Sequence, residues 1–163
     1  MKGSMIPLKL VVNDTAVSSK QAVRAVAFYK DKVLLMHLGS SDTYVLPGGS
    51  LEPEEPLEDG LRREVIEETG HEILACVKTI SVLENLEGFD REHHFYRVEL
   101  GKKIADASMT EEEMELEMSC RYLDLDEALD LMSVHEGTHH LSEAIQLREF
   151  IGIVHSVSLG GSQ

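Results

Sequence analysis

A chain of 163 residues, 42% of them hydrophobic and 28% charged, is long enough for one globular domain with its own core. The formal net charge of −15 argues against duplex nucleic acid or an anionic membrane surface as a partner, because both attract basic faces. No apolar run approaches the roughly 18 residues of a membrane-spanning helix. We expect one cytoplasmic domain over residues 1–163, with loose ends at 1–5 and 157–163 and with Cys76 and Cys120 reduced and buried.

The first half of the chain reads as strands followed by one helix. The predicted strands are Leu8–Val12, Ala22–Tyr29, Lys32–Leu38 and Thr43–Gly49. The second and third of these are separated by two residues and predict a hairpin, and Pro-Gly-Gly ends the fourth. A helix over Pro56–Thr69 follows, because proline suits the first helical position and Gly70 suits a left-handed helix end.

The second half alternates between strands and helices. The predicted strands are Ile73–Leu83, His93–Leu100 and Leu116–Leu125, and the predicted helices are Asp126–Met132 and Leu141–Val154. Residues 84–92 read as a turn, and residues 102–115 read as a polar, mostly acidic loop. The hairpin-like spacings are too short for an all-parallel sheet. We therefore expect an α/β chain of the α+β kind, with a mixed β-sheet and helices on both faces.

Three glutamates, Glu64, Glu67 and Glu68, crowd the end of the predicted helix. At about 100° per residue they occupy one arc beside an apolar stripe, and Gly60 lies in the same arc, where it would clear space for them. Acids at this end oppose the helix dipole by roughly 0.3–1 kcal/mol each, and they also repel one another. A hard divalent cation would offset this cost. The helix alone leaves open the alternative of a solvated acidic face.

The residues before the helix extend this pattern. From Gly49 the chain has five residues, Glu55, seven residues and then REVIEETG (Arg63–Gly70). This resembles the Nudix box, G-x5-E-x7-R-E-U-x-E-E-x-G-U, in which U is a bulky aliphatic residue. Every fixed polar and glycine position matches. His71 departs from the final U, and we expect this to affect local packing rather than chemistry. The stretches TYVLPGG and RYLDLDEAL also resemble the family, so that the resemblance covers most of the chain.

The resemblance implies a Nudix fold, an α/β/α sandwich around a mixed β-sheet. It also implies a hydrolase, a pyrophosphatase that cleaves the pyrophosphate linkage of a nucleoside diphosphate joined to another moiety. Nudix hydrolases use Mg²⁺ or Mn²⁺ as cofactor. The implied partner is a small-molecule nucleotide or nucleoside diphosphate derivative, with no duplex nucleic acid and no membrane. The oligomeric state is left open, a homodimer included.

The resemblance also assigns roles to residues. The implied metal ligands, direct or through water, are the carboxylates of Glu64, Glu67 and Glu68 and the backbone carbonyl of Gly48 or Gly49. Both glycines would let the chain turn tightly next to phosphate. Glu55 and Arg63 would hold the loop and the helix in register through a charge-assisted pair, a supporting role rather than a catalytic one.

The general base varies within the family between a glutamate of the box, here Glu64 or Glu67, and a glutamate on a distant loop. In this chain the acidic segment before the Leu116–Leu125 strand lies about where such a loop would be. Glu115 and Glu117 are the candidates there, and a solvated loop acid is the alternative for both.

The sequence does not select the substrate. No proline follows Pro56, which weakens a resemblance to the ADP-ribose type. A nucleoside triphosphate and a dinucleoside polyphosphate stay open, as does a non-catalytic nucleotide sensor, although the intact box favours an enzyme. The scarce positive charges that could hold a distal phosphate are Arg24, Lys78, Arg91 and Arg97. The adjacent histidines His93 and His94 face opposite sides of a strand, which argues against a shared metal ion.

Overall fold

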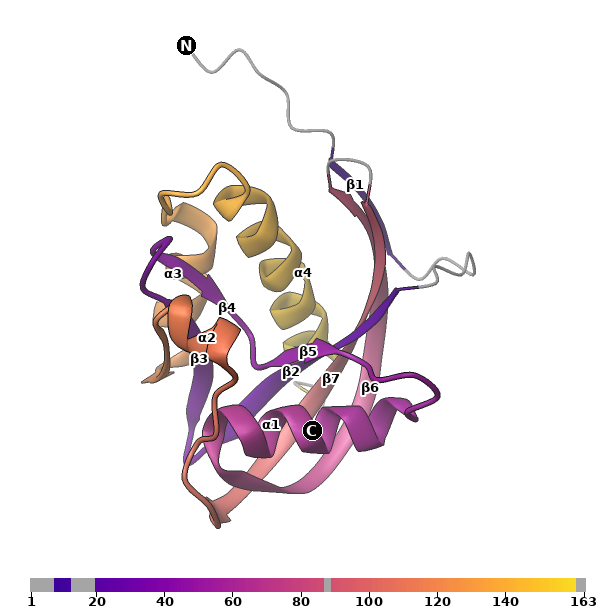
Figure 1. The fold of residues 1–163 in the computed structure, drawn as a ribbon, viewed down its shortest axis with the longest axis vertical. Coiled ribbons are helices and arrows are strands. Elements are labelled where there is room, and N and C mark those ends of the chain that lie inside the picture. The colour runs from indigo at the N-terminus through magenta and orange to yellow at the C-terminus, as the bar shows by residue number, and fades with distance from the viewer. Residues whose placement is uncertain (1–7, 13–19, 87–88, 161–163) are drawn as a thin grey trace.

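The computed structural model describes residues 8–12, 20–86 and 89–160, and its centre is an eight-stranded sheet (Figure 1). The strands are β1 (Leu8–Val12), β2 (Gln21–Tyr29), β3 (Lys32–Leu38), β4 (Thr43–Val45), β5 (Gly48–Ser50), β6 (His71–Leu86), β7 (Phe89–Lys103) and β8 (Met118–Leu123). The helices are α1 (Leu57–Thr69), α2 (Glu111–Glu115), α3 (Leu125–Val134) and α4 (Ser142–Gly160). No helix in this described part combines the length and apolar character needed to cross a bilayer.

The sheet is mixed, as predicted. Its strand order is β1-β6-β7-β2-β3-β4, with β5 paired to β2 and β8 paired to β3. The pairing of β2 with β7 is parallel, and the other pairings among the described strands are antiparallel. The predicted hairpin is present as β2 and β3. Its two turn residues, Lys30 and Asp31, have φ angles of 47° and 67°, the left-handed values that a two-residue hairpin turn requires.

The sheet splits between β2 and β3. These strands pair only at Phe28 and Tyr29, and further along β2 the short strand β5 takes over the same edge through Ala22–Arg24. The consequence is that Gly48 and Gly49, which precede α1 in the sequence, are brought beside the middle of the sheet.

Each face of the sheet carries an apolar core. On one face, Leu61 and Val65 of α1 are fully buried against β2 and β7, and Leu57 packs partly buried beside them. On the other face, Met132 of α3 and Ile153 of α4 are buried against the sheet. Each fully buried side chain of this kind stabilises the fold by roughly 1.5–3 kcal/mol. Helices therefore cover both faces, which confirms the predicted α/β/α sandwich and the predicted packing face of α1.

The prediction of a turn over residues 84–92 was wrong. β6 continues to Leu86 and β7 begins at Phe89, and the two strands pair along this stretch, with Glu84 opposite Arg91 and Asn85 opposite Asp90. We call residues 82–86 and 89–93 the arm, which rises beyond the rest of the sheet and carries β1 on its edge (Figure 1). The polar residues that suggested a turn are tolerated in strands because cross-strand pairing satisfies the backbone.

Further differences from the predicted elements concern the acidic segment and the ends of α1 and α4. The acidic segment predicted as a loop contains α2, which a capping box begins: the Glu113 amide donates to the Thr110 hydroxyl, and the Thr110 amide donates to the Glu113 carboxylate. Pro56 is the N-cap of α1 rather than its first residue, and Gly70 ends the helix as predicted, with φ 79°. α4 continues to Gly160, so that residues 157–160 are helical rather than a loose end.

His71, the residue that departs from the Nudix box, is buried and packs as a polar group. Its Nδ1 and Nε2 lie 2.8 Å from the Gly101 carbonyl oxygen and the Tyr122 hydroxyl, respectively, and its ring lies 4.5 Å from that of Tyr29. The histidine therefore occupies an aliphatic position without leaving a buried nitrogen unpaired. Cys76, on the neighbouring stretch of β6, and Cys120 are both free cysteines, as expected, but they are half-buried rather than buried.

Candidate functional site

A cleft of about 780 Å³ opens at the split in the sheet. Its walls come from β5, α1, α2, α4 and the arm, elements that are far apart in the sequence. Its lining includes Gly48, Gly49, Glu64, Glu68, Glu112 and Glu113. The glycines and glutamates of the box thus share one cavity with the acidic segment that precedes β8.

Three carboxylates converge in this cleft. One carboxylate oxygen each of Glu64, Glu68 and Glu113 lies within 4.8 Å of the other two. Glu64 and Glu68 are 8% and 1% exposed, while Glu113 is half-buried. Because Glu64 and Glu68 are four residues apart on α1, their side chains lie one above the other on the same face of the helix. The cluster is the one group of this kind among the described residues.

Glu68 is held at the bottom of the cluster. The backbone N–H of Gly48 donates a hydrogen bond to its Oε1 at 2.9 Å. Burial raises the pKa of Glu68 to about 9, helped by a hydrogen bond shared with Glu113 and opposed by the Gly48 N–H. Burial also raises the pKa of Glu64, against the opposing charge of Arg63. Burial therefore favours the binding of positive charge at both carboxyl groups, in the form of protons or of a metal cation.

The two glycines let the backbone reach the carboxylates. Gly48 has a φ of 150°, and a Cβ there would lie 2.0 Å from the Val23 carbonyl oxygen on β2. At Gly49 a Cβ would lie 2.8 Å from the carboxylate of Glu64. Neither position has room for a side chain. The pair of glycines in the sequence thus reflects close approach to both the sheet and the carboxylates.

The predicted ion pair of Glu55 and Arg63 is present. Arg63 Nε donates to Glu55 Oε2 and its Nη2 donates to Glu55 Oε1, both at 2.8 Å. This two-pronged pair lowers the pKa of Glu55 to about 2, with help from the Glu52 backbone N–H. Arg63 Nη1 also donates to Glu64 Oε1 at 3.0 Å, a contact that the sequence reasoning missed. One guanidinium therefore ties the loop before α1 to a member of the carboxylate cluster.

Glu67, which we expected to converge with Glu64 and Glu68, is not in the cluster with Glu113. It is 38% exposed, and its carboxylate lies 3.5 Å from Arg63 Nη1 on the outer side of α1. Relative to Glu68, the neighbouring residue on the helix, it is rotated by about 100°, which is too far for the two side chains to point the same way. Gly60 does not clear space for the carboxylates either, since a Cβ there would meet Leu51 at 2.3 Å.

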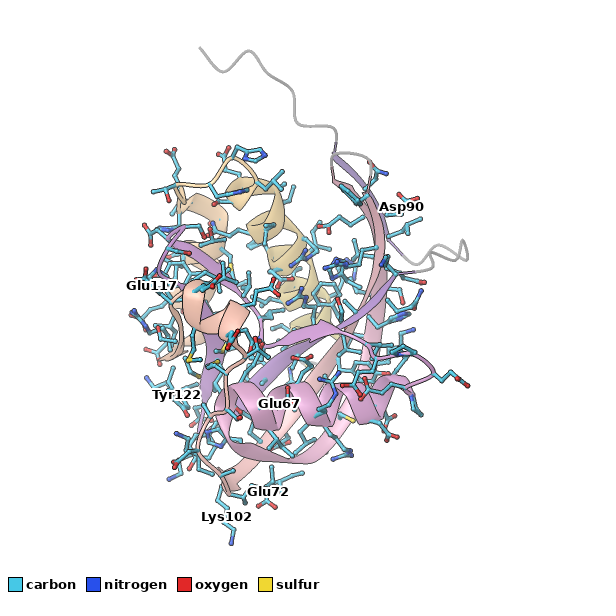
Figure 2. The ribbon with its side chains drawn as sticks, in the orientation of Figure 1. Glu67, Glu72, Asp90, Lys102, Glu117 and Tyr122 are labelled. Atoms are coloured by element: carbon cyan, nitrogen blue, oxygen red, sulfur yellow. The ribbon has the colours of Figure 1, made fainter. Side chains whose placement is uncertain are left out.

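The acidic segment contributes a different glutamate from the two that were predicted. Glu113 reaches the cluster, whereas Glu115 and Glu117 are exposed. Figure 2 shows Glu117 at the margin of the molecule, away from Glu67 on α1. Glu117 has a φ of 58° and lies beside Gly39 at the turn into β8. The signal that could have singled out Glu113 is its spacing of three residues from Thr110, which predicts a capping box.

The candidate arginines and lysine lie in three places. Arg24 and Arg91 line the cleft with the carboxylates, together with Lys20 and Arg148, which the sequence reasoning did not consider. Lys78 is exposed on β6 outside this lining.

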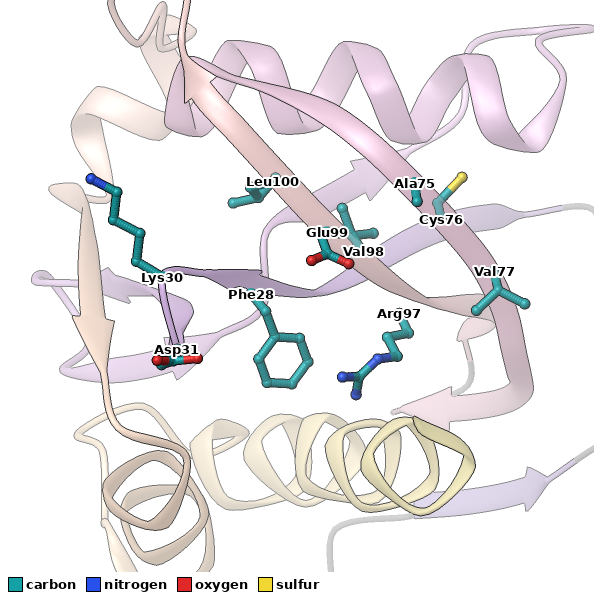
Figure 3. Close-up of a pocket in the computed structure, with 10 residues that line it drawn as sticks. All are labelled: Phe28, Lys30, Asp31, Ala75, Cys76, Val77, Arg97, Val98, Glu99 and Leu100. Carbon is teal, nitrogen blue, oxygen red and sulfur yellow. The ribbon is translucent and has the colours of Figure 1, made fainter. Parts of the chain in front are cut away.

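Arg97 lines a second cavity, of about 430 Å³, where its guanidinium lies 4.4 Å from the ring centre of Phe28 (Figure 3). No carboxylate cluster of the kind seen in the first cleft occurs there among the described residues.

Comparisons with known proteins identify one family for most of the chain. The family model described as NUDIX domain matches residues 19–145. A search of curated proteins finds no significant match.

Solved structures with the same fold include three named as enzymes. A NUDIX hydrolase from Nitrosomonas europaea is 22% identical, with a TM-score of 0.58, and the match covers 82% of this chain and 89% of that one. A pyrophosphohydrolase from Bacillus subtilis is 19% identical, with a TM-score of 0.65 and coverage of 91% and 90%. An ADP-ribose pyrophosphatase from Streptococcus suis is 17% identical, with a TM-score of 0.53 and coverage of 88% and 92%.

Proposed function

We propose that this chain, which belongs to the NUDIX family, is a metal-dependent hydrolase of pyrophosphate linkages in small nucleotide derivatives. The observation that carries the proposal is the cluster of Glu64, Glu68 and Glu113 in a cleft large enough for such a molecule. The substrate class comprises nucleoside triphosphates and nucleoside diphosphates joined to another moiety. The names of the similar structures, a pyrophosphohydrolase and an ADP-ribose pyrophosphatase, support this class.

The residues fit a hard divalent cation. All three donors are carboxylate oxygens, which Mg²⁺ and Mn²⁺ prefer over nitrogen or sulfur donors. The raised pKa values of Glu64 and Glu68 indicate that burial disfavours their charged forms in the absence of a counter-charge. A cation would supply that charge. We therefore assign Glu64 and Glu68 as its ligands, with the backbone carbonyl of Gly48 as a further one, while Glu113 lies beside them.

A bound Mg²⁺ or Mn²⁺ ion would neutralise charge on the pyrophosphate oxygens and lower the pKa of a water molecule. The chain itself positions the groups around that ion. The Gly48 N–H orients Glu68, and Arg63 orients Glu64. Glu67, half-exposed beside Arg63, is proposed to act through a water molecule.

Glu113 is the proposed general base. A base must have a carboxylate oxygen within hydrogen-bond reach of the attacking water, and Glu113 is the cluster member that comes from outside the box. Its Oε1 accepts a hydrogen bond from the Thr110 N–H at 2.9 Å, which fixes the side chain relative to α2. Its second oxygen can accept the proton that the water loses as its oxygen attacks phosphorus.

A substrate panel tests the proposal. The protein is incubated with nucleoside triphosphates, dinucleoside polyphosphates and nucleoside diphosphate sugars, with Mg²⁺ or with a chelator, and the released phosphate, pyrophosphate and nucleoside monophosphate are quantified. We expect hydrolysis of at least one substrate at a phosphoanhydride bond, with Mg²⁺ required. Hydrolysis that continues undiminished in the chelator would contradict the metal requirement, and products from any other bond would contradict the reaction class.

A further inference from the structure

The cleft has a basic side next to the carboxylates. Arg24 lies directly opposite Gly48 in the pairing of β2 with β5, and the Gly48 N–H holds Glu68. One backbone pairing thus separates Arg24 from the cluster. Arg148 of α4 lines the same cleft. In a chain with a net charge of −15, two arginines gathered at this point invite an explanation.

Buried carboxylates hold both arginines. Arg148 donates from Nε to Glu149 at 3.0 Å and from Nη1 to both oxygens of Glu84, at 3.2 and 3.1 Å. Arg24 Nε donates to His93 Nδ1 at 3.4 Å and lies 3.9 Å from Glu149 Oε1. Burial, together with the two arginines, lowers the pKa of His93 well below its ordinary value, so His93 is neutral and can accept from Arg24 while donating to Glu84.

One nitrogen of each guanidinium, Nη2, takes part in none of these hydrogen bonds. The hydrogen bonds of Arg24 use Nε and Nη1, and those of Arg148 use the same two atoms. No buried side-chain nitrogen in the described part of the chain lacks a partner. The Nη2 atoms of both arginines are therefore not fully buried, although the two side chains are only 11% and 5% exposed, and both arginines line the cleft. The donors are fixed in advance, which lowers the entropy lost when a ligand binds.

The arm adds charge at the rim of the cleft. Arg91 lines the cleft from β7, opposite Glu84, and makes no side-chain ion pair with any residue that the structure describes. Lys20 lines it from the start of β2. Both cations therefore line the same cleft as Arg24 and Arg148.

We propose that Arg24, Arg148 and Arg91 form a subsite for a phosphate group of the substrate that lies beyond the pyrophosphate held at the carboxylates. Guanidinium groups match phosphate geometry and form strong charge-assisted hydrogen bonds with it. This inference rests on the proposed function and narrows its substrate class to nucleotides with three or more phosphates in a row. A nucleoside diphosphate joined to an uncharged sugar would leave the subsite empty.

A binding experiment tests the subsite without any reaction. Inorganic pyrophosphate is titrated by calorimetry into the protein in a chelator, so that no metal ion on the carboxylate cluster can bind the pyrophosphate. Three variants are compared with the parent: Arg91→Gln, Arg148→Lys, and Lys78→Gln as a control that removes one positive charge outside the cleft. Circular dichroism melts confirm that each variant is folded. Arg91 is the safer substitution because it leaves no buried carboxylate unpaired.

We expect the parent to bind pyrophosphate, Arg91→Gln and Arg148→Lys each to bind it about tenfold more weakly, and Lys78→Gln to match the parent. No binding by the parent would overturn the subsite, and so would an equal loss in Arg91→Gln and Lys78→Gln. A second experiment measures turnover. Arg91→Gln should raise KM for a nucleoside triphosphate about tenfold and leave KM for the corresponding nucleoside diphosphate within about twofold of the parent's value. If no nucleotide is hydrolysed but pyrophosphate binding follows the expected order, the proposed function fails and the subsite stands.

Discussion

Replacing Glu68 with glutamine should stabilise the protein in the absence of metal, even though we assign this residue as a metal ligand. Glu68 is 1% exposed and shares the bottom of the cluster with Glu64 and Glu113. Glutamine has nearly the same shape, and its amide oxygen can still accept the hydrogen bond from Gly48. The substitution therefore removes the need to protonate a buried carboxyl group at neutral pH and leaves the packing in place.

The magnitude follows from the pKa. Burial, and then the hydrogen bond with Glu113, raise the pKa of Glu68 from 4.5 to about 9. A group whose pKa is higher in the folded state gives stability that is fully present below the unfolded pKa and is lost as pH rises through the folded pKa. At about 1.4 kcal/mol per pH unit, the metal-free parent should lose on the order of 3 kcal/mol between about pH 4.5 and pH 7. Glu68→Gln should be more stable than the parent by that amount at about pH 7.

The assay is urea unfolding of parent and variant in a chelator, at a series of pH values from acid to neutral. Glu54→Gln serves as the control, because Glu54 is exposed on the loop before α1. Mg²⁺ should then stabilise the parent more than Glu68→Gln, since a ligand bound by the native state alone raises its stability. The reasoning is refuted if the metal-free parent shows the same stability across the series, or if Glu68→Gln is less stable than the parent at neutral pH.

Three further predictions concern neighbouring groups. Glu55→Gln should cost about 1–2 kcal/mol at neutral pH, because it breaks the pair with Arg63. The folded pKa of Glu55 is lowered, so the parent's advantage over this variant should hold above 4.5 and vanish as pH falls through about 2, which acid unfolding of both proteins checks. Gly48→Ala should destabilise by at least about 2 kcal/mol in thermal melts, because its Cβ would overlap a carbonyl oxygen, and a melt equal to the parent's would count against this. Glu113→Gln should lower kcat at least about tenfold while Glu117→Gln stays near the parent, and the opposite order would return the role of base to Glu117.

The sequence predicted the fold largely because its signals were local. The hairpin of β2 and β3, the end of α1 at Gly70 and the apolar stripe of Leu61 and Val65 all follow from residues close together in the chain. The arm was missed because strand pairing over Glu84 and Asn85 depends on partners across the sheet rather than on strand propensity.

The same distinction separates what could be predicted of the site from what could not. The helical spacing predicted Glu64 and Glu68 on one face of a helix, and the resemblance to the Nudix box implied the pair of Glu55 with Arg63. It could not indicate which glutamate of the acidic segment reaches them, because that depends on how α2 packs in three dimensions. The sequence could not predict the place of Arg148 in the cleft for a similar reason. In the sequence it is one charged residue of a helix, and only the fold brings it to the cleft.

The central claim is that the carboxylate cluster supports hydrolysis of a phosphoanhydride bond. The most direct test is kcat at saturating Mg²⁺, on the best substrate of the panel, for the parent, for the double variant Glu64→Gln with Glu68→Gln, and for Glu54→Gln. We predict that the double variant loses at least about a hundredfold in kcat, roughly 2.7 kcal/mol or more of barrier, while Glu54→Gln stays within about twofold of the parent. Turnover by the double variant equal to that of the parent would contradict the claim.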